Sequence, residues 1–156
     1  MMNRMEILNE IQKFEKDFIA AGRLASKLRK DATTGTKMGT GVHEIDIVTS
    51  ADLAVQEYIL GRLSKSKILK SCELLAEEET KFTNGFAKKS NYVLTLDPID
   101  GTYLYASGKK MYKVIIGIHD KKNPLYTFCY FPEWDCRQIN PKRKLTGSAN
   151  HDFCVV

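Results

Sequence analysis

Apolar residues recur at steps of three and four between residues 4 and 30, which is the spacing of one face of a helix. Lysine and glutamate side chains occupy the positions opposite this stripe. The pattern predicts one long amphipathic helix over residues 4–30 that buries the stripe in the core. The apolar positions are Ile7, Leu8, Ile11, Phe14, Phe18, Ala21, Ala25 and Leu28.

The segment that follows, residues 31–42, contains three glycines and four threonines without periodicity, so it predicts a long loop. Loops of this length are commonly functional or disordered. Lys37 in this loop is either an ordinary surface lysine or a side chain that reaches a bound phosphate. A second helix is predicted over residues 51–63, because Thr49 and Asp52 have the spacing of a capping box.

Short runs rich in apolar and β-branched residues follow the two helices, and the later ones are separated by short gaps typical of antiparallel neighbours. Helices followed by strands predict an α+β fold, in which the helices cover one face of a mostly antiparallel sheet. We expect residues 1–156 to form a single domain. The predicted strands are residues 73–76, 92–96, 113–118 and 125–131.

The composition narrows the class of protein. With 43% hydrophobic and 28% charged residues, and no apolar run of the roughly 18 residues that a membrane span needs, the chain is predicted to be water-soluble, without a membrane partner. The N-terminus does not resemble a signal peptide, and the four cysteines form no C-x-x-C pair, so we expect the reducing cytoplasm and no disulfide scaffold. The net charge of +5 is carried by 18 lysines and only 6 arginines, which disfavours a nucleic-acid partner.

Candidate metal-binding and phosphate-binding residues lie in the sequence Asp97-Pro98-Ile99-Asp100-Gly101-Thr102, which comes directly after a predicted strand. A kinked strand end can supply two carboxylates and a backbone carbonyl to one hard divalent cation. If Gly101 and Thr102 begin a helix, their amides can also hold a phosphate. The alternative is an ordinary Asp-Pro turn of the kind found in many loops, and the residue types alone leave both interpretations open.

Two further segments place acidic residues at predicted boundaries. Three glutamates, residues 77–79, follow a predicted strand; they are either a solvated edge or the source of a third carboxylate ligand. In the segment from Asp46 to Asp52, Asp52 is either the acid of the capping box or a functional carboxylate.

Together, these three segments in this order resemble the inositol monophosphatase family of magnesium-dependent phosphatases. The hexapeptide at residues 97–102 is similar to the family signature. Residues 77–78 resemble its Gly-Glu-Glu element, with Ala76 in the glycine place, and residues 46–52 resemble its Asp-x-Val-Thr-x-x-Asp element. The resemblance covers about residues 5–131 and implies the first half of a layered α/β/α/β/α sandwich.

The resemblance implies that magnesium activates a water molecule, which attacks the phosphate of a small ester such as inositol monophosphate. It implies that Thr102 and Asp52 are a catalytic pair that orients this water and helps to deprotonate it, with assistance from Glu77. The amides of Gly101 and Thr102 would contact the phosphate. The metal ligands that it implies are Glu77, Asp97, Asp100 and the backbone carbonyl of Ile99.

The sequence departs from the family pattern in two places. Residues 103–105 read Tyr-Leu-Tyr where the family usually has Thr-Asn-Phe, which leaves the choice of substrate open. The family also has a second half with a Trp-Asp-x-Ala-Ala-Gly element, whose aspartate binds metal. Asp135, which follows Trp134, comes only 38 positions after Asp97 and lacks the small residues that follow, so we interpret Trp134 as a packing or strand residue.

The chain therefore resembles the N-terminal half of such a phosphatase, without the C-terminal domain. An apolar sheet face would remain uncovered, and we expect a homo-oligomer, most simply a dimer, to bury it. Catalysis by this half is expected to be weak or missing, and the alternative is a non-catalytic remnant that binds metal or protein. The side chains expected on that face are Val114, Ile116, Ile118, Phe128 and Tyr130.

Overall fold

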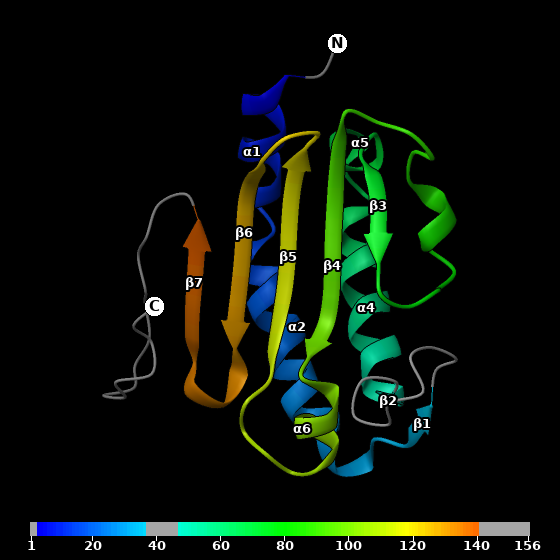
Figure 1. Ribbon diagram of the computed structural model, residues 1–156, viewed down its shortest axis with the longest axis vertical. Coiled ribbons are helices and arrows are strands. Elements are labelled where there is room, and N and C mark those ends of the chain that lie inside the picture. The colour runs from blue at the N-terminus through cyan, green and yellow to red at the C-terminus, as the bar shows by residue number, and fades with distance from the viewer. Residues whose placement is uncertain (1–2, 37–46, 141–156) are drawn as a thin grey trace.

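The computed structural model describes residues 3–36 and 47–140 of the chain. A five-stranded sheet lies at its centre. Figure 1 shows the helices α1 (Arg4–Gln12), α2 (Glu15–Leu28) and α4 (Ser50–Leu63) together on one face of this sheet. The predicted α+β fold, with helices on one face of a mostly antiparallel sheet, is confirmed.

The strand order in the sheet is β3-β4-β5-β6-β7. Strand β3 runs parallel to β4, and every later pair is antiparallel. All four predicted strands are present, and β4 continues beyond the predicted residues 92–96 into the hexapeptide. The edge strand β7 was not predicted, because its polar sequence shows little apolar alternation. The bounds are β3 (Glu73–Ala76), β4 (Tyr92–Asp100), β5 (Lys113–Asp120), β6 (Pro124–Phe131) and β7 (Cys136–Asn140).

The prediction of one helix over residues 4–30 was wrong, because the chain forms two helices there. The amides of Lys13 and Phe14 donate to carbonyls only three residues back, at 3.1 Å each, and this tighter turn ends α1. Helix α1 then contacts α5 (Lys67–Lys70), whereas α2 packs against β5 and β6. One straight helix would not make both contacts. Within the described segments, no helix combines the length and apolar character needed to cross a bilayer.

The predicted loop over residues 31–42 was wrong in part. Strands β1 (Thr34–Thr36) and β2 (Ile47–Thr49) form a two-stranded antiparallel sheet that leads into α4. Lys37 and Asp46 lie outside the described residues. The remaining short elements are η1 (Arg29–Asp31), η2 (Thr83–Gly85), α6 (Thr102–Ala106) and η3 (Pro132–Trp134).

One hydrophobic core joins the helices to the sheet. The strand register places Leu96, Ile116 and Phe128 in one row, and each of them is at most 3% exposed. Because side chains alternate along a strand, the neighbouring row that contains Thr95 and Thr127 lies on the opposite face of the sheet. The helix-facing rows therefore carry the larger apolar side chains.

The prediction of which side chains form the uncovered face was wrong. All five of the expected residues are at most 2% exposed, because they face the helices. The residues concerned are Val114, Ile116, Ile118, Phe128 and Tyr130. The opposite face carries Thr95, Ile115, Thr127 and Cys129, which are half-buried and less apolar. In the part of the chain that the structure describes, no helix covers this second face (Figure 1).

Cys72 and Cys129 carry free thiols. The cytoplasmic location stays a prediction.

Gly22 in α2 lies so close to β6 that a side chain does not fit there. A Cβ atom at this position would lie 2.8 Å from Cε1 of Tyr130 and 2.9 Å from Cγ of Pro132. We predict that Gly22→Ala lowers the free energy of unfolding by about 1–3 kcal/mol through overpacking, although alanine favours a helix. Chemical denaturation measures the effect, and the control is Gly85→Ala, whose Cβ would meet nothing within 4 Å. A free energy that is unchanged or higher in Gly22→Ala would contradict this packing.

Candidate active site

Strands β3 and β4 bring two acidic segments to the same edge of the sheet. The amide of Glu77 donates to the carbonyl of Leu96 at 3.1 Å, so the pairing continues one residue past the end of β3. Because parallel strands have their carboxyl ends at the same edge, Glu77 lies beside Asp97. Two of the predicted metal ligands therefore meet.

The Asp-Pro-Ile-Asp-Gly-Thr motif turns the chain from β4 into α6. The amide of Ile99 donates to the carboxylate of Asp97 at 3.2 Å, and the pairing with β5 is irregular between Asp97 and Asp100. Gly101 has φ 88°, a conformation that favours glycine, and a Cβ there would lie 3.0 Å from the carbonyl oxygen of Met111. The turn therefore requires glycine, and it gathers both aspartates at one end of the strand.

The predicted pair of Thr102 and Asp52 is in contact. The hydroxyl of Thr102 lies 3.1 Å from Oδ1 of Asp52 and 2.8 Å from the carbonyl oxygen of Ile99, so two acceptors compete for its one proton. Oδ2 of Asp52 accepts from the amide and the hydroxyl of Thr49, at 2.8 and 2.6 Å. Asp52 is therefore both the capping acid of α4 and the partner of Thr102, and the two interpretations do not exclude one another.

Gln56 is a site residue that the sequence reasoning missed. Its side-chain Nε2 donates to the carbonyl of Glu78, and the amide of Glu78 donates to Oε1 of Gln56 at 3.0 Å. Gln56 is 0% exposed and follows Asp52 by four residues on the same helix. A polar residue within the buried stripe of the predicted helix was the signal that could have revealed it.

A cavity of about 400 Å³ lies at this edge of the sheet. It brings together six of the seven predicted site residues, while Asp52 reaches it through Thr102. The lining residues are Glu77, Asp97, Ile99, Asp100, Gly101, Thr102, Tyr103 and Leu104.

Two of the acidic side chains at the cavity, Asp97 and Asp52, have a raised pKa. Burial raises the pKa of Asp97, and its hydrogen bond with Glu77 and the nearby charges of Glu77, Asp100 and Asp52 raise it further. Burial also raises the pKa of Asp52. Acidic groups this close favour a proton or a cation among them, and carboxylate, carbonyl and hydroxyl oxygens are the donors that magnesium takes. The residue types therefore fit a divalent cation.

These side chains are not drawn together around a single ion position. Across residues 3–36 and 47–140, no group of three or more histidine, cysteine or acidic side chains has the arrangement of a metal site. Asp97 is hydrogen-bonded to Glu77, and the ammonium group of Lys113 is paired with Asp100. The sequence reasoning also missed Lys113, because its place opposite Asp100 follows from the strand register.

Solved structures share the fold of this chain. The extragenic suppressor protein SuhB from Bartonella henselae matches with a TM-score of 0.71 and 19% identity, over 90% of this chain and 52% of that chain. An IMPase from Thermotoga maritima matches with a TM-score of 0.70 and 17% identity, over 91% and 52% of the two chains. A staphylococcal IMPase complexed with products matches with a TM-score of 0.66 and 22% identity, over 94% of this chain and 51% of that chain.

The sequence comparison assigns the family. The profile of the inositol monophosphatase family matches residues 8–151. Inositol monophosphatase 3 from Solanum lycopersicum is 25% identical over 122 residues, which are 78% of this chain and 45% of that protein. The chain belongs to the inositol monophosphatase family, as the three motifs predicted, and it spans about half the length of the relatives that it matches.

Ionisation of Asp97 is expected to destabilise the metal-free protein. In the folded state the pKa of this carboxyl is raised to about 8 from an ordinary value of 3.8, so the folded protein holds the proton more tightly than the unfolded chain does. This contribution to the free energy of unfolding is fully present below pH 3.8, the ordinary pKa, and is lost as the pH rises towards 8. In chelator-treated protein we predict that Tm, measured by circular dichroism, falls more over this range than in Asp97→Asn. The same pH dependence in both proteins would contradict the raised pKa.

Proposed function

We propose that this chain acts as a magnesium-dependent phosphomonoester hydrolase of the inositol monophosphatase type. One observation carries the proposal: Glu77, Asp97, Asp100 and Thr102 line one cavity, and Asp52 accepts a hydrogen bond from Thr102. Family membership and fold support the same reaction class. Because the chain spans about half the length of its relatives, catalysis by this chain alone is expected to be weak or missing.

The residues divide the chemistry between ligation and proton transfer. Magnesium, when bound, neutralises phosphate charge and lowers the pKa of water. The hydroxyl of Thr102 donates to Asp52, so the Thr102 oxygen can accept a proton from the attacking water while its own proton passes to the carboxylate of Asp52. Glu77, which also lines the cavity, assists this water. The proposed ligands are Glu77, Asp97, Asp100 and the backbone carbonyl of Ile99.

The proposed substrate is a small phosphate ester such as inositol monophosphate. A dual specific IMPase/NADP phosphatase of the same fold has been solved with D-inositol-1-phosphate, and an IMPase/NADP phosphatase with Mg²⁺ and phosphate. In this chain the amides of Gly101 and Thr102 would hold the phosphate. Tyr103 and Leu104, which also line the cavity, stand where the family usually has other residues and would select the alcohol.

A non-catalytic role in binding metal or protein is the second candidate. Two observations favour it: the acidic side chains are not drawn together around an ion position, and one face of the sheet has no helix over it in the described residues (Figure 1).

For either function we propose that residues 1–156 form a single, water-soluble, cytoplasmic domain that self-associates.

Release of inorganic phosphate separates the two functions. The purified chain is assayed with inositol monophosphates, fructose bisphosphate and adenosine bisphosphate, with magnesium and with a chelator. A hydrolase releases phosphate from at least one ester in a magnesium-dependent way. Absence of release from every ester, together with retained magnesium binding, would favour the non-catalytic role.

Two substitutions distinguish ligation from water activation. Asp97→Asn should abolish magnesium binding, because a neutral amide does not replace a carboxylate on a hard cation. Thr102→Ala should leave magnesium affinity largely intact and slow turnover by about 10²-fold or more, the contribution typical of positioned proton transfer. Calorimetry measures the magnesium affinity of both variants, and phosphate release measures their turnover. An equal loss of magnesium affinity in both variants would contradict the separate roles.

We predict that the chain sediments as a dimer at micromolar concentration, because a closed two-fold pairing is the commonest way for one surface to bury itself. The surface proposed to pair is the sheet face that carries Ile115 and Thr127, over which no helix lies within residues 3–36 and 47–140. A charge on this face, in Thr127→Glu, should shift the protein to monomer. The matched control is Lys121→Glu in the exposed turn between β5 and β6, which should remain dimeric. A stable wild-type monomer would show that this face does not pair with itself.

A further inference from the structure

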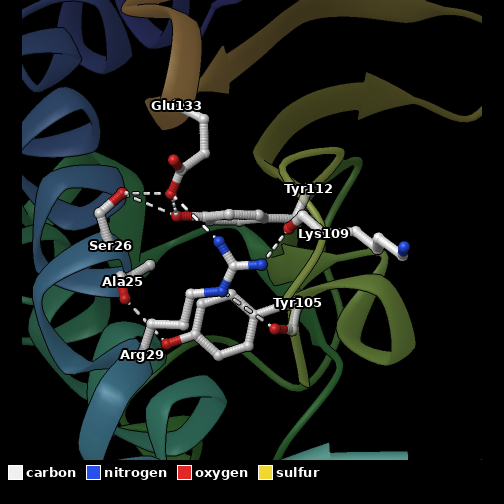
Figure 2. Close-up of polar contacts among 7 residues, drawn as sticks. All are labelled: Ala25, Ser26, Arg29, Tyr105, Lys109, Tyr112 and Glu133. Atoms are coloured by element: carbon white, nitrogen blue, oxygen red, sulfur yellow. Dashed lines mark hydrogen bonds and ion pairs between the residues drawn. The ribbon is translucent and has the colours of Figure 1, made fainter. Parts of the chain in front are cut away.

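Arg29 lies where three segments that are far apart in the sequence meet. Figure 2 shows its guanidinium group between the rings of Tyr105 and Tyr112. Its Cζ atom lies 5.4 Å from the centroid of the first ring and 5.3 Å from that of the second, which is within the range of a cation–π interaction. The Arg29 side chain is only 17% exposed. The charge is therefore held mostly inside the protein.

Each nitrogen of the guanidinium group has an acceptor on a different segment. Nε donates to the carbonyl of Tyr105 at 3.0 Å, at the end of α6. Nη2 donates to the carbonyl of Lys109 in the following loop, and Nη1 lies 3.4 Å from the carboxylate of Glu133 in η3. A planar fork with fixed donor directions makes this set of contacts, and a lysine ammonium does not reproduce it.

The two tyrosines complete the attachment to α2. The hydroxyl of Tyr105 donates to the carbonyl of Ala25 at 2.8 Å. The hydroxyl of Tyr112 donates to Glu133 at 2.7 Å and lies 2.7 Å from the hydroxyl of Ser26. Figure 2 shows these contacts as one connected network. The loop after α6 is thus fastened to α2 by side chains at both of its ends.

This loop also lies directly against the candidate phosphate-binding turn. The carbonyl oxygen of Met111 would lie 3.0 Å from a Cβ on Gly101, and Cα of Tyr112 would lie 3.7 Å from it. The amide of Tyr105 donates to the carbonyl of Gly101 at 2.9 Å. Movement of the loop would therefore move Gly101 and Thr102.

We propose that Arg29 is a positioning residue: by fastening residues 105–112 to α2, it holds the Gly101–Thr102 turn in place at the cavity. The consequence for phosphate binding rests on the proposed function. The role of Arg29 in fixing the turn does not rest on the proposed function, because it follows from contacts that lie outside the cavity.

The experiment uses the full chain with Arg29→Ala and Arg29→Lys. Hydrogen–deuterium exchange reports the protection of residues 101–112 relative to β5, and calorimetry reports the affinity for inorganic phosphate in the presence of magnesium. Guanidinium chloride at non-denaturing concentration is then added to test for chemical rescue. The matched control is Arg23→Ala in α2, the helix directly before Arg29, because the exposed side chain of Arg23 contacts Asp135 instead of the loop.

We expect exchange of residues 101–112 to accelerate by roughly tenfold in both Arg29 variants, the effect of losing hydrogen bonds to a charged group, while β5 keeps its protection. Phosphate affinity should fall in parallel. Added guanidinium should restore both properties in Arg29→Ala but not in Arg29→Lys. The control Arg23→Ala should keep the protection and the affinity of the wild-type protein with or without guanidinium. If Arg29→Ala does not fold, Arg29→Lys decides, because it keeps the charge and the aliphatic stem.

Unchanged protection of residues 101–112, or an equal loss throughout β5, would overturn the inference and leave Arg29 a general stabilising residue. Normal phosphate affinity in a variant with a loosened turn would also overturn it. Failure of the proposed function is a distinct result: wild-type protein would not bind phosphate with magnesium, while the exchange data would still show whether Arg29 holds the turn.

Discussion

The buried polar side chains of helix α4 are the constraint on which the candidate site depends. Asp52 and Gln56 are both 0% exposed and lie four residues apart, which places them on the same face of the helix. Asp52 contacts Thr102 after β4, and Gln56 pairs with the backbone of Glu78 after β3. Because buried polar groups cost free energy unless they are hydrogen-bonded, packing α4 on the sheet fixes both turns together. The position of the cavity is thus a consequence of the core.

Two sets of contacts support the candidate site, and acidic side chains lie between them. Helix α4 supports the start of α6, and Arg29 supports its end and the loop beyond it. Between these supports, burial raises the pKa of Asp97, and the neighbouring carboxyl groups raise it further. The ammonium group of Lys113 compensates part of this charge at Asp100. Acidic groups held this close favour a cation among them, and positioning together with charge neutralisation is the main contribution that a protein makes to phosphoryl transfer.

Local patterns predicted the helix of α4, the strands and the family motifs, because spacing alone carries that information. The break after Gln12 escaped prediction, since the apolar stripe continues across it and only the separate contacts of α1 and α2 end the first helix. The uncovered face was assigned to the wrong side of β5 and β6, because alternation separates two faces without saying which one meets the helices. The contacts of Gln56, Lys113 and Arg29 were missed for a different reason: their partners are distant in sequence, and only the assembled fold brings them together.

Magnesium titration of Gln56→Met tests most directly whether α4 organises a cation site. The substitution removes the pairing with Glu78 and touches none of the proposed ligands, and Gln12→Met at the exposed end of α1 is the matched control. We predict that the wild-type chain and the control bind magnesium, and that Gln56→Met binds it roughly tenfold more weakly, as is typical when the support of a ligand is removed. Equal affinity in all three proteins, or no magnesium binding by the wild-type chain, would contradict the account.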